Sequence, residues 1–306
     1  MGFEPPQRLV RALGETYGEA AAADWLGRLP ALTGEALSAV GHDVAVDRVV
    51  APGGRSSLVL LVHHRDGTPA VLKIAPAGAA PALERAALTQ WDGWGAVRLL
   101  ASGDGAVPEG ALLLERLHHE VSLRSLPDAK ALLEAAGTVR RLWVEPPPGH
   151  PYESVEERTG RQAGPMLAAA AADPALETLV SEALAARAEL VAYAPELLLL
   201  HGNFRQSKVL LGERSPWLAV GPEPLVGERA YDLARLVRDR VEDLIASPGG
   251  AATARRRIRK LADSLEVDQA RLRGWTLFRA VESGTRALAA GRRQDGELSL
   301  EFAGWL

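Results

Sequence analysis

The most informative stretch of this 306-residue chain is LLLLHGNFRQSKVLLGERSPWLAVGPEPLVGERAYDLARLVRDR, residues 197–240. Short apolar runs at 197–200, 209–211 and 217–220 are typical of strands, and polar residues separate them. A helical pattern begins at Tyr231. The stretch therefore predicts short strands, joined by polar loops, in front of a helix.

The rest of the second part of the chain is expected to be mainly helical. Leu and Ala recur at helical spacing in most of it. The predicted helices cover residues 128–144, 166–193, 231–246, 251–265 and 272–290. We therefore expect a mainly helical domain over residues 118–306.

The first part has the opposite character, because β-prone runs dominate it. The predicted strands cover residues 44–50, 57–63, 70–74, 96–100 and 111–117. A helix is predicted over 81–91, and two short helices over 8–40, with Pro30 as the break between them. The chain is therefore an α+β protein whose first domain, residues 1–117, combines N-terminal helices with a β-rich lobe.

Composition excludes several classes of function. A formal charge of -4 and a pI of about 6.0 argue against a nucleic-acid partner. The chain has no cysteine, so it has neither disulfides nor thiolate metal sites. Neither a signal-peptide pattern nor an apolar run of the roughly 20 residues that a membrane span needs is present. We expect a cytoplasmic protein without a membrane partner.

A glycine-rich turn lies between two of the predicted strands. It reads Gly53-Gly54-Arg55-Ser56-Ser57. Glycine permits unusual dihedral angles and lets backbone N–H groups approach a phosphate closely. Alone the signal is weak, because most Gly-Gly turns are only turns. It makes Gly53, Gly54, Ser56 and Ser57 candidate nucleotide-binding residues.

Lys73 strengthens this interpretation. It lies in the strand-like segment AVLKIAP, about twenty residues after the glycine-rich turn, and Glu84 follows on a predicted helix. A lone lysine on a strand is usually only solvated. A strand lysine paired with a helix glutamate, however, is how kinases hold the α- and β-phosphates of a nucleotide. Lys73 and Glu84 therefore join the candidate nucleotide-binding residues, although a structural salt bridge would explain them equally well.

Residues 197–240 resemble the catalytic and metal-binding segment of the aminoglycoside/hydroxyurea kinase family. That family has HGD-L-H-x-G-N-V-L, followed by P-W-L-A-I-D-P-K-P-L-V-G-x-x-A-Y-D-L-A. The segments GTPAVLKIAP, WDGWGAVRLL and GALLLERL also look like the family, and the resemblance covers roughly residues 20–290. It implies the bilobal protein-kinase-like (aminoglycoside phosphotransferase) fold, with a β-rich N-lobe, a mainly helical C-lobe and a nucleotide between them. It also adds Glu115, in GALLLERL, to the candidate nucleotide-binding residues.

The catalytic positions depart from the family pattern. Asn203 stands where the family has the catalytic aspartate, which orients the attacking hydroxyl and accepts its proton. An amide cannot accept that proton at a useful pKa. Arg205 stands where the family usually has histidine. Asn203 and Arg205 are therefore candidate catalytic-site residues of a degenerate kind.

The metal-binding positions depart as well. Lys208 stands where the family has the asparagine that ligates magnesium, and Gly221 where it has the second metal-binding aspartate. An ammonium group only donates hydrogen bonds, and glycine offers no side chain. Glu223 replaces the lysine of that motif. We expect the protein itself to bind no magnesium. Lys208 could neutralise nucleotide phosphates instead, or simply fill the site or pair with Glu223.

Three functional hypotheses follow. The favoured one is a pseudokinase, a binding or regulatory protein that retains ATP or another nucleotide, or a small molecule, with a small-molecule or protein partner of unknown identity. The alternative is an active ATP-dependent phosphotransferase acting on an alcohol group of an aminoglycoside-like molecule, with Asp232, Glu223 or Glu228 as an unorthodox catalytic residue. The third is a scaffold whose cleft is filled.

One further charged segment has a simpler explanation. Arg255, Arg256 and Arg257 lie with Arg259 and Lys260 on a predicted helix. Such a run is usually a solvated helix face, and a partner-binding role is the less favoured interpretation.

Overall fold

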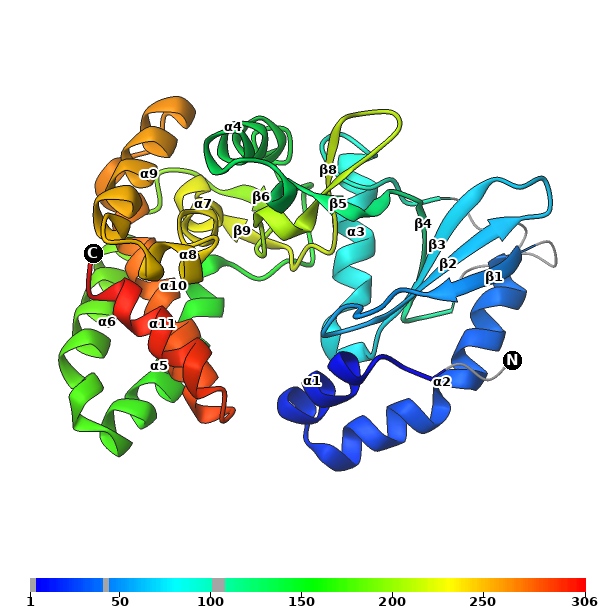
Figure 1. The fold of residues 1–306 in the computed structure, drawn as a ribbon, viewed down its shortest axis with the longest axis horizontal. Coiled ribbons are helices and arrows are strands. Elements are labelled where there is room, and N and C mark those ends of the chain that lie inside the picture. Colours follow the sequence, from blue (N-terminus) through cyan, green and yellow to red (C-terminus); the bar gives the residue numbers. More distant parts are fainter. Residues whose placement is uncertain (1–3, 41–43, 101–107) are drawn as a thin grey trace. The chain divides into compact units, whose positions relative to one another are not determined.

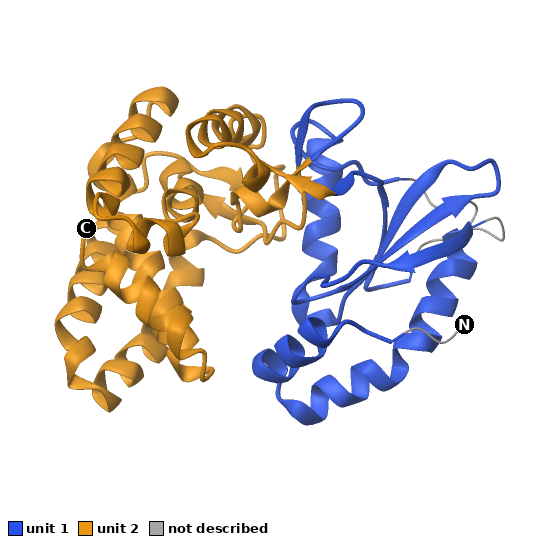
Figure 2. Cartoon of the chain, in the orientation of Figure 1, with its two compact units in different colours: residues 1–119, 211–218 blue, residues 120–210, 219–306 orange. Residues whose placement is uncertain are grey.

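The computed structural model describes residues 4–40, 44–100 and 108–306, and the chain divides into two compact units (Figures 1 and 2). The N-terminal unit comprises residues 1–119 and 211–218, and the C-terminal unit comprises residues 120–210 and 219–306. Segment 211–218 belongs to the N-terminal unit although it is distant in sequence, which the expected division at residue 117 did not include.

The N-terminal unit is built on an antiparallel sheet. Its helices and strands are α1 (Gln7–Tyr17), α2 (Glu19–Val40), β1 (Val44–Val49), β2 (Leu58–His64), β3 (Pro69–Ile74), η1 (Ala77–Ala79), α3 (Pro81–Trp91) and β4 (Ala111–Glu115). The strand order is β1-β2-β3-β4, and each neighbouring pair is antiparallel. Segment 96–100, which we predicted as a strand, forms only isolated bridges, of which one joins Leu99 to Leu114.

The core of this unit lies between the sheet and the first two helices. Leu58, Leu60 and Val62 alternate along β2 and are fully buried, as expected for residues that share one face of a strand. Leu13 and Leu29, from α1 and α2, pack into the same cluster. Figure 1 shows both helices beside the sheet. This packing fixes the strands that carry Lys73.

The break between α1 and α2 is not at Pro30, as the sequence suggested. The chain turns at Gly18, whose φ of 85° is accessible to glycine. Helix α2 continues through Pro30. Leu29, Thr33 and Ala36 are buried on one side of it. Tertiary packing of this side offsets the backbone hydrogen bond that proline cannot make.

The C-terminal unit is mainly helical. Its helices are α4 (Asp128–Val139), α5 (Val155–Ala172), α6 (Glu177–Ala192), α7 (Arg229–Val237), α8 (Val241–Ala246), α9 (Gly250–Leu265), α10 (Gln269–Ala289) and α11 (Arg293–Ala303), with short turns η2 (Leu123–Ser125), η3 (Pro174–Leu176) and η4 (Gln206–Lys208). Helix α10 packs against α5, α6, α7, α9 and α11. Its aromatic residues Trp275 and Phe278 are almost fully buried, so α10 is the centre of this unit.

Short strands complete the fold. Strands β6 (Leu198–Leu200) and β9 (Leu225–Gly227) pair with each other, and β9 was not predicted. Strands β5 (His118–Ser122), β7 (Val209–Leu211) and β8 (Trp217–Ala219) form a second sheet, in the order β5-β7-β8. The boundaries of the two units fall within β5, β7 and β8.

Three predicted helices have different ends in the structure. The single helix expected over 166–193 is two helices, because Asp173 and Pro174 start a new turn after α5. Helix α5 begins earlier, at a capping box formed by Ser154 and Glu157. The helix expected over 231–246 is divided before α8, where Arg240 has a φ of 56°. Helix α4 ends at Val139 rather than residue 144.

Candidate functional site

The N-terminal unit brings Lys73 and Glu84 together. Lys73 lies on β3 between Val59 of β2 and Leu112 of β4, and Glu84 lies in the first turn of α3. The two side chains form a salt bridge and are only 13% and 4% exposed. Within the described residues, the other oxygen of Glu84, Oε1, is buried without a hydrogen-bond partner. The predicted ion pair is therefore formed, and its role toward a nucleotide stays a prediction.

The glycine-rich turn lies between β1 and β2. Gly53 has a φ of 72°, and a Cβ atom there would lie 2.9 Å from the Val50 carbonyl oxygen. Arg55 Nη2 is bonded to Glu15 Oε2 of α1 at 2.6 Å, so the first helix holds the turn. Ser57 is buried and Ser56 is exposed. The structure places Gly53, Gly54, Ser56 and Ser57 in one turn between two paired strands, and their role toward a nucleotide stays a prediction.

Glu115 has a structural partner. Its carboxylate accepts hydrogen bonds from Arg214 Nη2 at 2.7 Å and Nε at 3.0 Å, and from the backbone N–H of Arg98 at 2.7 Å. Arg214 belongs to the segment that returns to this unit. Glu115 therefore links that segment to the N-terminal unit, and its nucleotide role stays a prediction.

In the C-terminal unit, a buried carboxylate shapes the loop that follows β6. Asp232, on α7, accepts hydrogen bonds from the backbone N–H groups of His201 at 2.9 Å and Gly202 at 2.7 Å. His201 is fully buried, and its Nδ1 accepts from the Asn203 N–H at 3.3 Å. Burial, together with the charge of Lys208, lowers the pKa of His201 to about 3. The imidazole is neutral at physiological pH and supports the loop.

The side-chain amide of Asn203 is hydrogen-bonded to the carboxylate of Glu223. Its Nδ2 donates to Glu223 Oε1 at 2.6 Å. Its own Oδ1 is buried and has no hydrogen-bond partner among the described residues. The amide thus orients Glu223, and position 203 itself carries no carboxylate of the kind that the family resemblance implies.

Glu223 is an ionised carboxylate among cations. The residue is accessible to solvent, although many protein atoms surround its carboxyl group. This desolvation opposes ionisation, but the charges of Arg235 and Lys208, followed by those of Arg158 and Arg279, outweigh it. The pKa of Glu223 is therefore held below its ordinary value, which makes it a weak proton acceptor.

Lys208 fills the space beside Gly221. Gly221 has a φ of 61°, and an ideal Cβ built on it would lie 2.6 Å from Lys208 Nζ. The Val220 N–H also donates to the Lys208 carbonyl oxygen at 2.8 Å. The two positions where the family resemblance implies metal ligands thus hold an ammonium group and no side chain. They do not fit a magnesium ion, because a cation offers it no oxygen ligand.

The described residues also contain no cluster of side chains that could bind a metal ion. Over residues 4–40, 44–100 and 108–306, no three His, Asp or Glu side chains are grouped so that they could hold an ion. The same described ranges contain no helix with the length and apolar character to cross a membrane.

Two of the three carboxylates considered as unorthodox catalytic residues are structural. Asp232 is fully buried and is used by the backbone of the loop. Glu228 is 3% exposed and accepts hydrogen bonds from Arg271 and from Trp275 Nε1 at 2.5 Å. Glu223 is the one of the three that solvent reaches. It is therefore the best placed of these carboxylates to meet a ligand.

The sequence pointed to Arg205 but not to Arg235, Arg238 and Arg279, whose charges act in the same region. Arg205 is half-buried. Its positive charge, with those of Arg279 and Arg238, lowers the pKa of Arg235. The spacing of Arg235 and Arg238 by three residues places them on one side of the chain at the end of α7. This spacing was the signal available in the sequence. The run at 255–257 was predicted to be a solvated helix face, but Arg257 is buried and bonded to Asp128.

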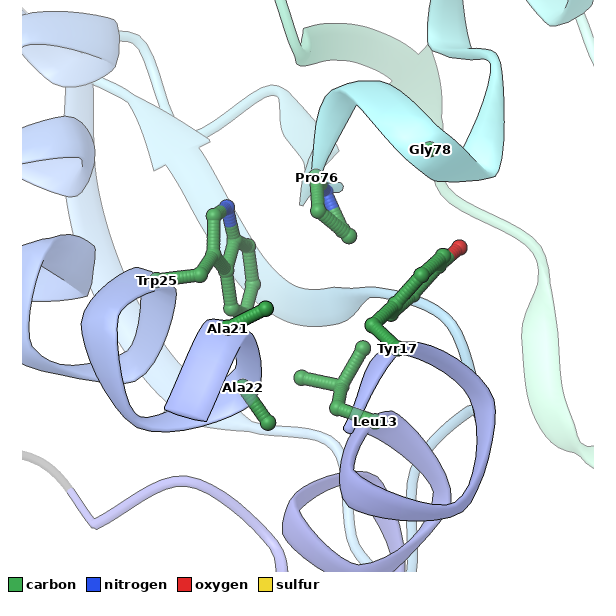
Figure 3. A pocket seen from close by; sticks show the side chains of 7 residues that line it. All are labelled: Leu13, Tyr17, Ala21, Ala22, Trp25, Pro76 and Gly78. Carbon is green, nitrogen blue, oxygen red and sulfur yellow. The ribbon is translucent and has the colours of Figure 1, made fainter. Parts of the chain in front are cut away.

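A separate pocket of about 190 Å³ lies in the N-terminal unit (Figure 3). It lies between α1, α2 and the segment after β3, and its walls are Leu13, Tyr17, Ala21, Ala22, Trp25, Pro76 and Gly78. Figure 3 shows the rings of Trp25 and Tyr17 on opposite sides of it. The walls are almost entirely apolar and carry no charged group, so they do not fit a nucleotide phosphate.

Known kinases are similar to this chain in sequence. Streptomycin 6-kinase from Streptomyces glaucescens is 35% identical over 303 residues, which cover 98% of this chain and 94% of that protein. Hydroxyurea phosphotransferase from Kitasatospora aureofaciens is 36% identical over 288 residues, covering 93% of this chain and 79% of that protein.

Solved structures agree on the fold. The crystal structure of aminoglycoside phosphotransferase APH(4)-Ia has a TM-score of 0.57 at 17% identity, covering 85% of this chain and 93% of that one. Choline kinase from Cryptosporidium parvum has a TM-score of 0.57 at 11% identity, covering 88% of each chain. The α+β fold with a β-rich N-terminal part and a helical C-terminal part is thus the kinase-like fold that the sequence predicted.

A model of the family described as "Aminoglycoside/hydroxyurea antibiotic resistance kinase" matches residues 42–291. This match covers most of the chain and includes Lys73, Glu84, Asn203 and Lys208. With the sequence relatives above, it shows that the chain belongs to the aminoglycoside/hydroxyurea antibiotic resistance kinase family.

Proposed function

We propose that this protein is a nucleotide-binding pseudokinase of the aminoglycoside phosphotransferase type. The observation that carries the proposal is the position of Lys208 Nζ, 2.6 Å from where a side chain on Gly221 would begin. A cation at this point opposes the binding of a second cation. Phosphoryl transfer relies on metal and charge stabilisation, so losing these ligands together with the catalytic carboxylate removes most of the rate enhancement.

Support for retained nucleotide binding comes from the N-terminal unit. Lys73 is paired with Glu84 and held in a sheet whose register is regular around it. Such a pair presents an ammonium group to the α- and β-phosphates in kinases.

Calorimetry with ATP, with and without magnesium, tests the proposal. We expect ATP to bind the wild-type protein with an affinity that magnesium changes by less than about threefold, since a metal without protein ligands adds little binding energy. The variant Lys208→Asn/Gly221→Asp rebuilds both ligands and should make binding magnesium-dependent. Binding to the wild-type protein that requires magnesium would contradict the proposal.

A second candidate function is an active ATP-dependent phosphotransferase that acts on an alcohol group of an aminoglycoside-like small molecule. Two observations favour it: the relatives named above are kinases, and Glu223 is a solvent-accessible carboxylate oriented by Asn203. Its depressed pKa makes it a poor base. The candidate predicts measurable product in mass spectrometry after long incubation with streptomycin and magnesium-ATP.

The same assay separates the two functions. Product formed by the wild-type protein and lost in Glu223→Gln would establish the second candidate. Absence of product, together with magnesium-independent ATP binding, would support the pseudokinase. A control variant, Glu213→Gln, changes an exposed glutamate outside the loop and should behave as the wild type in both assays.

A further inference from the structure

Five arginines gather in the C-terminal unit around the loop after β6. We call them the arginine cluster: Arg205 in the loop, Arg235 and Arg238 at the end of α7, and Arg279 and Arg286 on α10. The charges of Arg205, Arg279 and Arg238 act on Arg235, and those of Arg279 and Arg286 act on Arg238. Like charges are thus concentrated in one partly buried region.

Arg279 is held firmly in this region. Its Nη2 donates to the Gly202 carbonyl oxygen at 2.8 Å, and its Nη1 donates to the Tyr231 carbonyl oxygen at 2.9 Å. Its guanidinium also lies over the Tyr231 ring, 4.2 Å from the ring centroid. These contacts fix a positive charge beside the loop, and they do not neutralise it.

Burial and mutual repulsion make Arg235 and Arg238 unusual. Desolvation, together with the neighbouring arginines, lowers the pKa of Arg235 to about 9 and that of Arg238 to about 10. The attraction of Glu223 for Arg235, and of Glu282 and Asp239 for Arg238, offsets only part of this effect. Arg238 Nη1 is buried and has no hydrogen-bond partner in the described part of the chain. A guanidinium in this setting destabilises the folded protein unless an anion compensates it.

The nearby carboxylates already accept from other groups, and one of them, Glu282, is paired with Arg286 of the cluster itself. Asp232 accepts from two backbone N–H groups of the loop. Asp239 accepts from the Gln206 N–H at 2.5 Å, and Glu282 accepts from Arg286 at 2.7 Å. Glu223 accepts from the Asn203 amide. These four carboxylates are outnumbered by the arginine cluster and Lys208, which leaves an excess of positive charge.

Guanidinium groups bind carboxylates and phosphates through paired hydrogen bonds, and a site with several of them selects oxyanions. A polycation such as an aminoglycoside would be repelled by the same charges. The cluster therefore favours a ligand of the opposite charge from the substrates that give the family its name.

We propose that the arginine cluster is a binding site for a small anionic molecule that carries a phosphate or carboxylate group. The ligand's oxyanion is bound by Arg235 and Arg238, with Arg279 as a fixed neighbouring charge. This inference goes beyond the proposed function, because it concerns the C-terminal unit alone and holds whether or not the N-terminal unit binds a nucleotide.

The test uses inorganic phosphate and citrate as probes, with streptomycin as the cationic comparison. Calorimetry and thermal unfolding should show that both anions bind and stabilise the wild-type protein, and that streptomycin does neither. Arg235→Met and Arg238→Met should each weaken anion binding by at least tenfold. The control, Arg256→Met, replaces an exposed arginine of α9 and should leave anion binding unchanged.

Stability of the unliganded variants gives an independent readout. If the cluster is built for a ligand, removing one charge from this excess should leave the melting temperature equal to or above that of the wild type. A merely structural network would lose stability when either arginine is replaced. Lower melting temperatures together with unchanged anion binding would overturn the proposal.

A final variant distinguishes this site from the nucleotide site. Lys73→Met/Glu84→Leu removes the ion pair of the N-terminal unit and should abolish ATP binding while leaving citrate binding intact. Loss of citrate binding in that variant would place the anion in the N-terminal unit and overturn the proposal. Retained citrate binding, with ATP unable to bind even the wild type, would refute the proposed function alone.

Discussion

The two units of this protein treat the machinery of their family differently. In the N-terminal unit, Lys73 and Glu84 are kept and form the expected ion pair. In the C-terminal unit, Asn203, Lys208 and Gly221 stand at the positions where the family resemblance implies a base and metal ligands. Both regions lie on intact scaffolds. A residue that matches the family can be required for folding, so a match alone does not indicate function.

Burial offers that explanation. Glu84 is 4% exposed, so losing Lys73 would leave an uncompensated charge inside the protein. His201 and Asp232 are fully buried as well, and both match the family. Catalytic and metal-binding side chains must instead meet a ligand, so they contribute less to folding and can change at lower cost. The Lys73–Glu84 pair alone is therefore weak support for nucleotide binding.

The largest expected effect concerns this pair. Lys73→Met should lower the free energy of unfolding by about 3–5 kcal/mol, because Glu84 loses its counter-ion inside the protein. Urea denaturation measures it. Lys130→Met, at an exposed position of α4, should change stability by less than about 0.5 kcal/mol.

The double variant Lys73→Met/Glu84→Leu completes that test. Replacing both charges with apolar groups should recover most of the lost stability. If the single variant loses less than about 1 kcal/mol, stability does not require the pair, and its retention would point to function.

The next effect is a loss of stability in acid that comes from His201. Its pKa is about 3 in the folded protein against 6.5 ordinarily, so between these values the unfolded chain binds the proton and the folded chain does not. Stability from this group is complete above pH 6.5 and falls by about 1.4 kcal/mol per unit as pH decreases. Between about pH 6.5 and pH 5 the loss is about 2 kcal/mol.

Urea titrations at pH values across this window check the prediction. His201→Asn should show a shallower dependence on pH, whatever its absolute stability. His118→Asn, at a half-exposed histidine of the N-terminal unit, should keep the wild-type slope. An unchanged slope in His201→Asn would mean that another group causes the acid sensitivity.

A smaller effect separates backbone strain from charge at Gly221. Gly221→Ala should cost about 1–2 kcal/mol, because its φ of 61° lies in the left-handed region. Gly221→Asp carries the same strain but places a carboxylate near Lys208, so it should be less destabilised than the alanine variant. Equal losses in the two variants would show that Lys208 does not act on this position.

The smallest effect concerns Glu223. Its pKa is lowered, so its ionised form stabilises the folded protein above the ordinary value of 4.5, and this contribution is lost as pH falls. Glu223→Gln should cost less than about 1 kcal/mol at neutral pH, since solvent screens an accessible carboxylate. Denaturation curves of the two proteins should converge in acid. A constant difference would exclude this charge as the cause.

Local patterns predicted much of the fold. The hairpin of β2 and β3 and the helix at Pro81–Trp91 were found close to where the sequence placed them. Both depend on residues near each other in the chain, namely alternation on the strands and a proline at the start of the helix. The Lys73–Glu84 pair was predicted because a strand lysine followed by a helix glutamate is the pattern of kinases, and the structure confirms the ion pair.

Errors arose where distant residues decide the outcome. Helix α2 continues through Pro30 because the sheet covers one of its sides. Arg257 looked like part of a solvated face, yet Asp128 and two backbone carbonyls bury and bind it. Helix α11 was missed because its buried face depends on contact with α10.

The identity and order of the residues alone predicted the family and the kinase-like fold, both of which are confirmed. They also predicted that Asn203, Lys208 and Gly221 stand where the family has a base and metal ligands, and this stays a prediction. The contacts that these three residues make could not be predicted and depend on the fold. It set Lys208 against Gly221, joined Asn203 to Glu223, and gathered Arg235 with Arg279. Charges interact through space, and Arg235 and Arg279 are 44 positions apart in the chain. No local pattern in the sequence predicts that two such distant residues lie close enough to interact.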